Sequence, residues 1–217
     1  MKKTALFLIA ALLLNGCLGM KTDIELSKNG SGKISVEFSV SKEALSMADN
    51  FGQSGGSDEK PVIPMGREDF ERGIEGIAGL KMTSFSTKED DVNKIFFIKM
   101  SFTNIDALLA YLQTQNGVAS FKKDGNKSVL TFSFSADEQP VDPQIKGIVP
   151  FLFAGYYMDF GITLPEKCDV VCFDANGLKI DKPQVGEISV NNKTAQFKVP
   201  MGDLISSATP VKMQITW

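Results

Sequence analysis

The chain of 217 residues contains no histidine. Imidazole is the commonest general base near neutral pH and the commonest zinc ligand, so its absence excludes most triads, dyads and zinc sites. Carboxylate pairs and Ser-Lys chemistry remain open to the chain. However, the sequence has no Gly-x-Ser-x-Gly motif, and no carboxylate pair can be picked out from it. We therefore expect a protein that is not an enzyme and holds no metal or cofactor.

The sequence also lacks an apolar run of the ~18–20 residues that a transmembrane helix requires. The run from Ala5 to Leu14 follows Lys2 and Lys3, which is the order of the basic and apolar regions of a secretory signal peptide. The run is followed directly by Asn15-Gly16-Cys17. A small residue therefore stands just before a cysteine at the end of the apolar stretch.

This ending resembles the lipobox of bacterial lipoproteins. In that family the cysteine thiol takes a diacylglycerol, a signal peptidase cuts before the cysteine, and the new N-terminus is usually acylated. Asn15 departs from the pattern, since the family prefers Ala, Ser, Thr, Val or Ile there. The resemblance implies that 1–16 is a signal peptide, that Cys17 is the lipidated first residue, and that 17–21 is a tether. The alternatives are an ordinary signal peptide with an incidental cysteine, or a short transmembrane anchor.

Basic residues are too few to favour a nucleic-acid partner. Residues 1–16 hold two of the 23 basic residues and no acidic one, so the remainder carries 21 basic and 26 acidic residues, a net charge of −5. Such a chain has no electrostatic attraction to nucleic acid, and only local patches could favour anionic lipid headgroups.

Besides Cys17, the chain has two cysteines, Cys168 and Cys172. The β-branched residues between them indicate a strand, in which their Cα atoms would lie ~13 Å apart, whereas a disulfide needs less than ~7 Å. We expect two unbridged thiols buried on one strand face. A disulfide would require this segment to turn, and two thiolates supply only half of a tetrahedral metal site.

Period-two alternation of apolar and polar residues predicts a hairpin over 22–40, about the turn Asn29-Gly30-Ser31-Gly32. Helical patterns predict helices over 41–50, 67–74 and 104–113. The fold class expected for 22–217 is α+β: a mainly antiparallel sheet, about three short helices on one of its faces, and a β-meander at the C-terminal end. Further strands are expected over 80–87, 92–102, 118–123, 127–135, 169–174, 178–180, 187–190, 194–199 and 211–217.

Two segments interrupt this pattern. The Gly- and Ser-rich stretch 52–66 has few apolar residues and is expected to be a mobile loop. The stretch 138–143 contains Pro140 and Pro143 and marks an internal boundary, if the chain has one. A third segment, Asp174 to Asp181, faintly resembles a calcium loop, but Asn-Gly turn chemistry explains it without a metal.

The segment Ile145 to Met158 is the most apolar stretch after the signal peptide. One interpretation is a core element beneath the sheet. The other is the wall of a lipid-sized pocket, or a loop that dips into the membrane. In this second interpretation the ligand-binding residues would be Phe151, Phe153, Tyr156, Tyr157 and Phe160.

Several pieces together resemble the LppM-like family of bacterial lipoproteins. They are the lipobox, the Ser27 to Gly32 turn with the strand that follows it, Phe160 to Pro165, Val170 to Gly177, and a closing strand with Trp217. The resemblance implies an α+β domain in the cell envelope and, for the mycobacterial relatives, binding of a membrane glycolipid. Family members often end in a transmembrane helix, whereas this chain is expected to have the lipid on Cys17 as its membrane attachment.

These observations predict a non-catalytic lipoprotein of the bacterial cell envelope that binds a lipid or another apolar envelope ligand. No Asp follows Cys17, which favours the outer membrane or cell surface over the inner membrane if the organism has both. The alternative is a structural or interaction lipoprotein, such as an assembly factor or surface antigen that holds a protein partner. An envelope hydrolase is the third interpretation.

Overall fold

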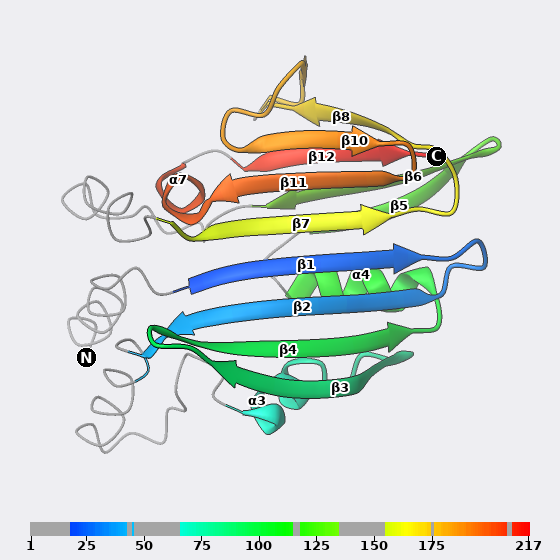
Figure 1. Ribbon diagram of the computed structural model, residues 1–217. Coiled ribbons are helices and arrows are strands. Elements are labelled where there is room, and N and C mark those ends of the chain that lie inside the picture. The colour runs from blue at the N-terminus through cyan, green and yellow to red at the C-terminus, as the bar shows by residue number, and fades with distance from the viewer. Residues whose placement is uncertain are drawn as a thin grey trace, which may run out of the picture.

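The computed structural model describes residues 18–42, 45, 66–114, 118–134, 155–174, 176–207 and 210–217. Within them the chain forms two sheets, with strand orders β10-β11-β7-β1-β2-β4-β3 and β5-β6-β12-β8-β9 (Figure 1). The strands are β1 (Leu18–Leu26), β2 (Gly32–Ser41), β3 (Leu80–Glu89), β4 (Asn93–Phe102), β5 (Val118–Asp124), β6 (Lys127–Phe134), β7 (Tyr157–Thr163), β8 (Asp169–Phe173), β9 (Lys179–Ile180), β10 (Glu187–Asn191), β11 (Thr194–Pro200) and β12 (Val211–Thr216). The helices are α3 (Arg67–Gly73), α4 (Ile105–Thr114) and α7 (Met201–Ser206).

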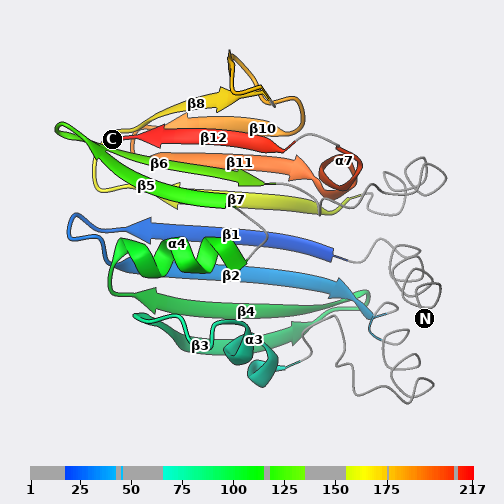
Figure 2. The same ribbon diagram turned by 180° about the vertical axis from the view of Figure 1, so that it is seen from behind.

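The seven-stranded sheet is covered on one face, which we call its inner face. The five-stranded sheet packs against its β11 and β7 part, where the ring of Phe134 lies 5.2 Å from that of Phe160 and 5.4 Å from that of Phe197. Helix α4 lies over β1 and β2, and α3 lies over β3 (Figure 2). Phe70 of α3 contacts the rings of Phe38 and Phe96. No described element covers the opposite, outer face (Figures 1 and 2). The predicted α+β class, with helices on one face of the sheet, is confirmed.

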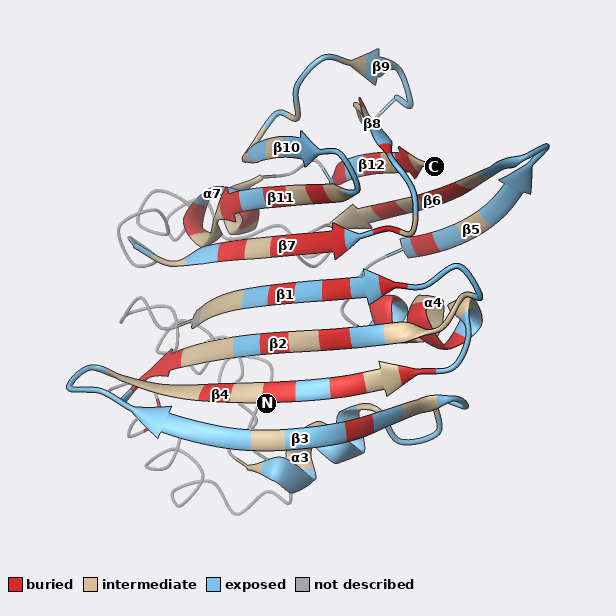
Figure 3. Ribbon diagram, turned by 45° about the vertical axis from the view of Figure 1, so that its right-hand side comes forward, coloured by how far each residue is buried: buried red, intermediate tan, exposed pale blue. Residues whose placement is uncertain are grey.

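Strict alternation along the strands explains this arrangement. Along β1, Thr22, Ile24 and Leu26 are buried, whereas the residues between them are exposed (Figure 3). Every strand pair that we describe is antiparallel except β1 with β7, which is parallel. Gly32 has no side chain, and a Cβ there would lie 2.4 Å from Cζ of Phe102. Because Gly32 has no Cβ, the Phe102 ring can pack against its backbone at the end of the hairpin.

The structure differs from the sequence predictions at several points. Strand β1 begins at Leu18, so 18–21 is not a tether: Leu18 pairs with Val40, and Met20 pairs with Phe38. The pattern missed this start because Leu18-Gly19-Met20 does not alternate between apolar and polar residues. Helix α7 was not predicted either, since six residues are too few to establish a helical period.

The C-terminal strands do not form a simple meander. Strands β10 and β11 join the larger sheet, whereas β8, β9 and β12 join the smaller one. Each sheet contains strands from before and after 138–143, because β7 pairs with β1 in the larger sheet and β12 pairs with β6 in the smaller one. The described fold is therefore not divided at that segment. The segments 52–65 and 138–143 themselves, and most of the predicted helix 41–50, lie outside the described residues.

Both cysteines of the folded part are free and buried, as predicted. Cys172 in β8 pairs with Met213 of β12, and the thiol of Cys168 donates to the backbone oxygen of Asn192 at 3.6 Å. Burial raises the pKa of both thiols. At neutral pH each is therefore a protonated thiol, which is a poor nucleophile.

We expect both thiols to resist iodoacetamide in the folded protein at pH 7–8 and to react fully in denaturant without prior reduction, because folding removes both access and thiolate. Mass spectrometry of the intact chain would count the added groups. A peptide linked through both cysteines, or rapid modification of the folded protein, would contradict this prediction.

None of the described helices is long and apolar enough to cross a membrane. The described residues also contain no group of three or more Cys, Asp or Glu placed to hold a metal ion. At the segment that resembled a calcium loop, Asp174 Oδ1 accepts from the backbone N–H groups of Asn176 and Leu178, at 2.9 and 2.8 Å. This carboxylate closes the turn by accepting from the backbone, as Asp and Asn side chains do in Asx turns.

Candidate functional site

A cleft of about 500 Å³ lies at the end of the seven-stranded sheet where β1 begins. It opens on the outer face, and its volume is in the range of small-molecule sites, ~300–1,000 Å³. Strands β1, β2, β7 and β11, the start of β4 and the residues just before β7 form its walls. The lining residues are Gly19, Met20, Lys21, Glu37, Ser39, Asn93, Gly155, Tyr156, Tyr157, Asp159 and Lys198.

Strand register places a row of alternating charges in this cleft. Lys198 of β11 is opposite Asp159 of β7, Asp159 is opposite Lys21 of β1, and Lys21 is opposite Glu37 of β2. All four side chains belong to the outer face, because their chain neighbours, such as Met158 on β7, are buried on the inner face. Opposite charges on directly paired strands attract each other, so each charge of the row is stabilised by its cross-strand neighbours.

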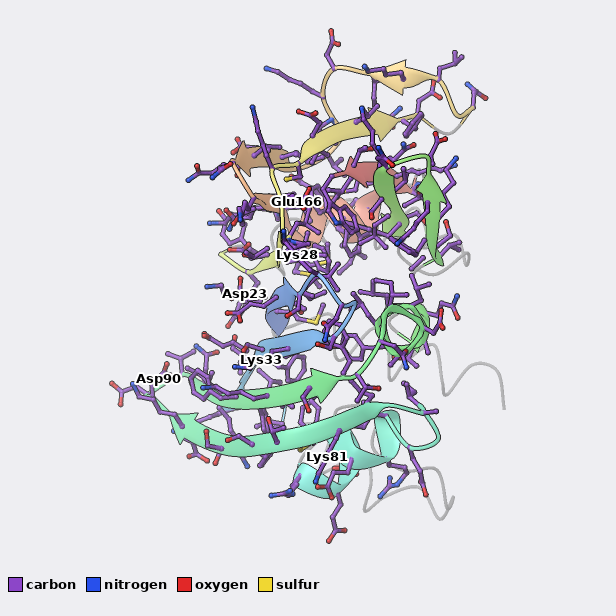
Figure 4. The ribbon with its side chains drawn as sticks, turned by 90° about the vertical axis from the view of Figure 1, so that its right-hand side faces the viewer. Asp23, Lys28, Lys33, Lys81, Asp90 and Glu166 are labelled. Carbon is purple, nitrogen blue, oxygen red and sulfur yellow. The ribbon has the colours of Figure 1, made fainter. Side chains whose placement is uncertain are left out.

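Lys21 is surrounded by carboxylates. Its Nζ lies 3.3 Å from Oδ2 of Asp23, the next outward residue of β1, which Figure 4 shows on the uncovered side of the sheet. The pKa of Lys21 is raised, chiefly by its hydrogen bond to Asp23 and by that carboxylate's charge, with smaller contributions from Asp159 and Glu37. The lining thus holds two ammonium groups, Lys21 and Lys198, and two carboxylates, Glu37 and Asp159, while Asp23 lies beside Lys21 outside the lining. The cleft offers both donors and acceptors but no excess of positive charge for a free anion.

Two tyrosines form one side of the cleft. The hydroxyl of Tyr156 donates to Oδ1 of Asn93 at 3.0 Å, which ties the approach to β7 to the start of β4. Tyr157 is 43% exposed, and Nζ of Lys198 lies 4.6 Å from the centroid of its ring. Gly19 leaves room for the Tyr156 ring, since a Cβ there would already lie 3.3 Å from its Cδ1. The cleft therefore presents one exposed aromatic ring beside alternating charges.

The structure separates the residues that were predicted from the sequence to bind a ligand together. Tyr156 and Tyr157 border the cleft. Phe160 is 4% exposed, and its ring lies 5.0 Å from Phe132 and 5.2 Å from Phe134 in the core between the sheets. Successive side chains of a strand point to opposite faces, so Phe160, three residues after the outward-facing Tyr157, faces the interior. It is therefore not part of the cleft. Phe151, Phe153 and Cys17 lie outside the described residues.

The charged residues of the cleft were not predicted from the sequence. Alternation does predict that Lys21, Glu37, Asp159 and Lys198 point outward. Lys21 and Glu37 lie on β1 and β2, which the predicted hairpin already pairs, but Asp159 and Lys198 belong to strands far along the sequence. Nothing in the alternation indicates that those strands are neighbours of β1. Only the parallel pairing of β1 with β7 brings the two halves of the row together.

A second, more open hollow lies between α3 and β3. Its apolar residues include Ile74, Ile77 and Met82, and its rim carries several charged residues of α3. Two of the charged pairs are already satisfied within the helix, since Arg67 Nε lies 2.7 Å from Glu71 Oε1 and Arg72 lies 3.3 Å from Asp69. Because this hollow is more open than the cleft and both of its arginines are already paired within α3, it is the weaker candidate for a binding site.

No protein-family model matches the chain, and no curated protein matches it either. Among solved structures, the chain is similar to the folded domain of the Mycobacterium tuberculosis LppM protein, determined by NMR. The two are 12% identical, with a TM-score of 0.42, over 92% of this chain and 88% of that domain. At this TM-score the two structures agree only loosely.

Proposed function

We propose that this protein is a non-catalytic lipoprotein of the bacterial cell envelope, held to a membrane by acyl chains on Cys17, and that its cleft binds the headgroup of an envelope lipid. One observation carries the proposal: Gly19, part of the cleft lining, is the second residue after Cys17. Two Cα–Cα steps of ~3.8 Å keep Gly19 within about 8 Å of the proposed anchor. The cleft then lies within reach of lipid headgroups.

The chemistry of the lining favours a headgroup over acyl chains. The sequence alone suggested an apolar pocket, but Lys21, Asp159, Lys198 and Glu37 make the cleft polar. Alternating donors and acceptors match hydroxylated or zwitterionic groups, and the exposed face of Tyr157 can pack against a ring or a cationic group. The acyl chains of the ligand would stay in the membrane. A lipid or glycolipid headgroup fits both the charges and the position of the cleft.

We expect Tyr157→Ala to reduce lipid binding about tenfold, equivalent to about 1.4 kcal/mol, because it removes the exposed ring of the cleft. The test is native mass spectrometry of protein extracted from membranes in mild detergent, scored as the fraction that retains a non-covalent lipid. The melting temperature should change little, since Tyr157 is 43% exposed and the loss of its side chain leaves no buried cavity.

Phe173→Ala is the matched control. Phe173 also carries a lysine over its ring, with Nζ of Lys212 5.8 Å from the centroid, but it belongs to the five-stranded sheet. It should leave lipid retention unchanged. Equal retention in both variants and the parent protein would show that the cleft is not the lipid site.

The alternative is an interaction lipoprotein, either an assembly factor or a surface antigen. It is favoured by the outer face of the seven-stranded sheet, which no described element covers (Figures 1 and 2). Ile95 and Phe97 lie half-buried on that face among polar residues. If the protein extracted from membranes retains another protein and no lipid, this alternative is the better one. In either case we propose that, in an organism with both membranes, the protein lies at the outer membrane or cell surface, because no Asp follows Cys17.

A further inference from the structure

The folded domain begins without a linker. Leu18 directly follows Cys17 and is already paired with Val40 of β2. From there β1 is paired on both sides, because Met20 also pairs with Met158 of β7. Strand pairing fixes backbone direction, whereas a flexible tether would leave the domain free to rotate. A lipid on Cys17 would therefore be attached to the end of a rigid strand.

Several other elements end or turn at this same end of the sheet. Pro200 of β11 pairs with Tyr157, and Val40 pairs with Lys94 of β4. The turn between β3 and β4 follows, and Figure 1 shows it at the end where β1 starts. Asp90 Oδ1 holds this turn by accepting from the backbone N–H groups of Val92 and Asn93, at 2.8 and 2.6 Å. We call the ends of β1, β7 and β11 together with this turn the proximal rim.

The rim carries side chains that suit a headgroup layer. Val92 is 60% exposed at the tip of the turn, and Tyr157 presents an apolar ring with a polar hydroxyl. Lys42 and Lys198 can extend their ammonium groups to the surface while their stems stay apolar. The acidic residues of the turn offset these lysines, and Lys42 Nζ lies 3.8 Å from Oε2 of Glu89. The rim therefore has no strong attraction to anionic lipid, and the anchor must set its position.

We propose that the protein stands on the membrane by its proximal rim, with the strands of the seven-stranded sheet pointing away from the bilayer. This inference rests on the proposed acylation of Cys17. In this orientation the proximal rim contacts the lipid surface. Strand β1 has nine residues, so its far end stands about 26 Å above its start at ~3.3 Å per residue. The cleft opens beside the rim, and its ligand enters from the membrane.

The test compares probes at the two ends of β1. Val92→Cys and Lys28→Cys each place one exposed thiol, at the rim and in the turn after β1, and each is labelled with the same fluorophore. Lys28 forms only an exposed ion pair with Glu166, at 3.3 Å, which contributes little to stability. The parent protein, with buried Cys168 and Cys172, gives the background labelling. The acylated proteins are placed in phosphatidylcholine vesicles containing a lipid with a nitroxide on its headgroup.

Quenching at Val92 should exceed quenching at Lys28 several-fold. It should persist at ~1 M salt, where charges are screened beyond ~3 Å. Ten Gly and Ser residues inserted between Cys17 and Leu18 give a flexible reach of about 17 Å and should remove most of the difference. Equal quenching at both sites, or stronger quenching at Lys28, in protein that floats with the vesicles would overturn this orientation alone. Protein that does not float would overturn the proposed anchor and, with it, the orientation.

Discussion

Cys17→Ser is expected to abolish lipid anchoring of the mature protein. A serine hydroxyl cannot take the thioether-linked diacylglycerol, and lipidation supplies about 0.8 kcal/mol of membrane affinity per buried CH₂. Without it, the variant should accumulate either as the uncleaved precursor or as a water-soluble chain. Detergent phase partitioning followed by intact mass measurement distinguishes these forms from the acylated parent.

Cys172→Ala is the control for this experiment. It also removes one thiol, but a buried one in β8 that plays no part in the anchor. It should retain the acylated mass and partition with detergent. A Cys17→Ser protein that has the mature mass and still partitions with detergent would exclude acylation of this residue. An attachment through the folded domain would then have to be sought.

Phe160→Ala is expected to lower the free energy of unfolding by about 3–5 kcal/mol, the usual cost of truncating a buried phenylalanine. The ring is 4% exposed and lies between the two sheets, 5.0 Å from Phe132 and 5.2 Å from Phe134. Its loss leaves a cavity where the two layers meet, and the paired strands around it cannot close in without breaking their register. Urea unfolding followed by circular dichroism measures the change.

Tyr157→Ala is the matched substitution on the same strand. Its ring points to the outer face, so its loss should cost less than about 1 kcal/mol, as for surface positions. Phe160→Ala should leave lipid retention by the folded fraction unchanged, whereas Tyr157→Ala should lower it. If Phe160→Ala instead left stability intact and removed lipid binding, the space between the sheets would be the ligand site.

The alternation of residues was enough to predict most strands and the α+β class. It also predicted which residues of each strand face the core. In β2, for example, Ile34 and Val36 are buried, whereas Lys33 and Glu37 are exposed, as their positions in the pattern require. The anchor prediction likewise depends only on local sequence, because lipobox recognition involves a short segment and no tertiary contact. The prediction that Cys168 and Cys172 are unbridged and buried is also confirmed, although Cys168 lies just before β8 and not within it.

Beyond the hairpin of β1 and β2, strand partners and strand starts could not be predicted in this way. Alternation gives each strand an inner face but does not specify its neighbour. The same pattern therefore fits a C-terminal meander and the two sheets observed equally well. The start of β1 at Leu18 depends on pairing with Val40, a residue 22 positions away. Sequence alone therefore determined the class of fold and the inner or outer face of most strand residues, and it predicted the anchor. Tertiary structure decided the cleft, because only pairing between distant strands brings Lys21, Glu37 and Asp159 into one row beside Tyr157.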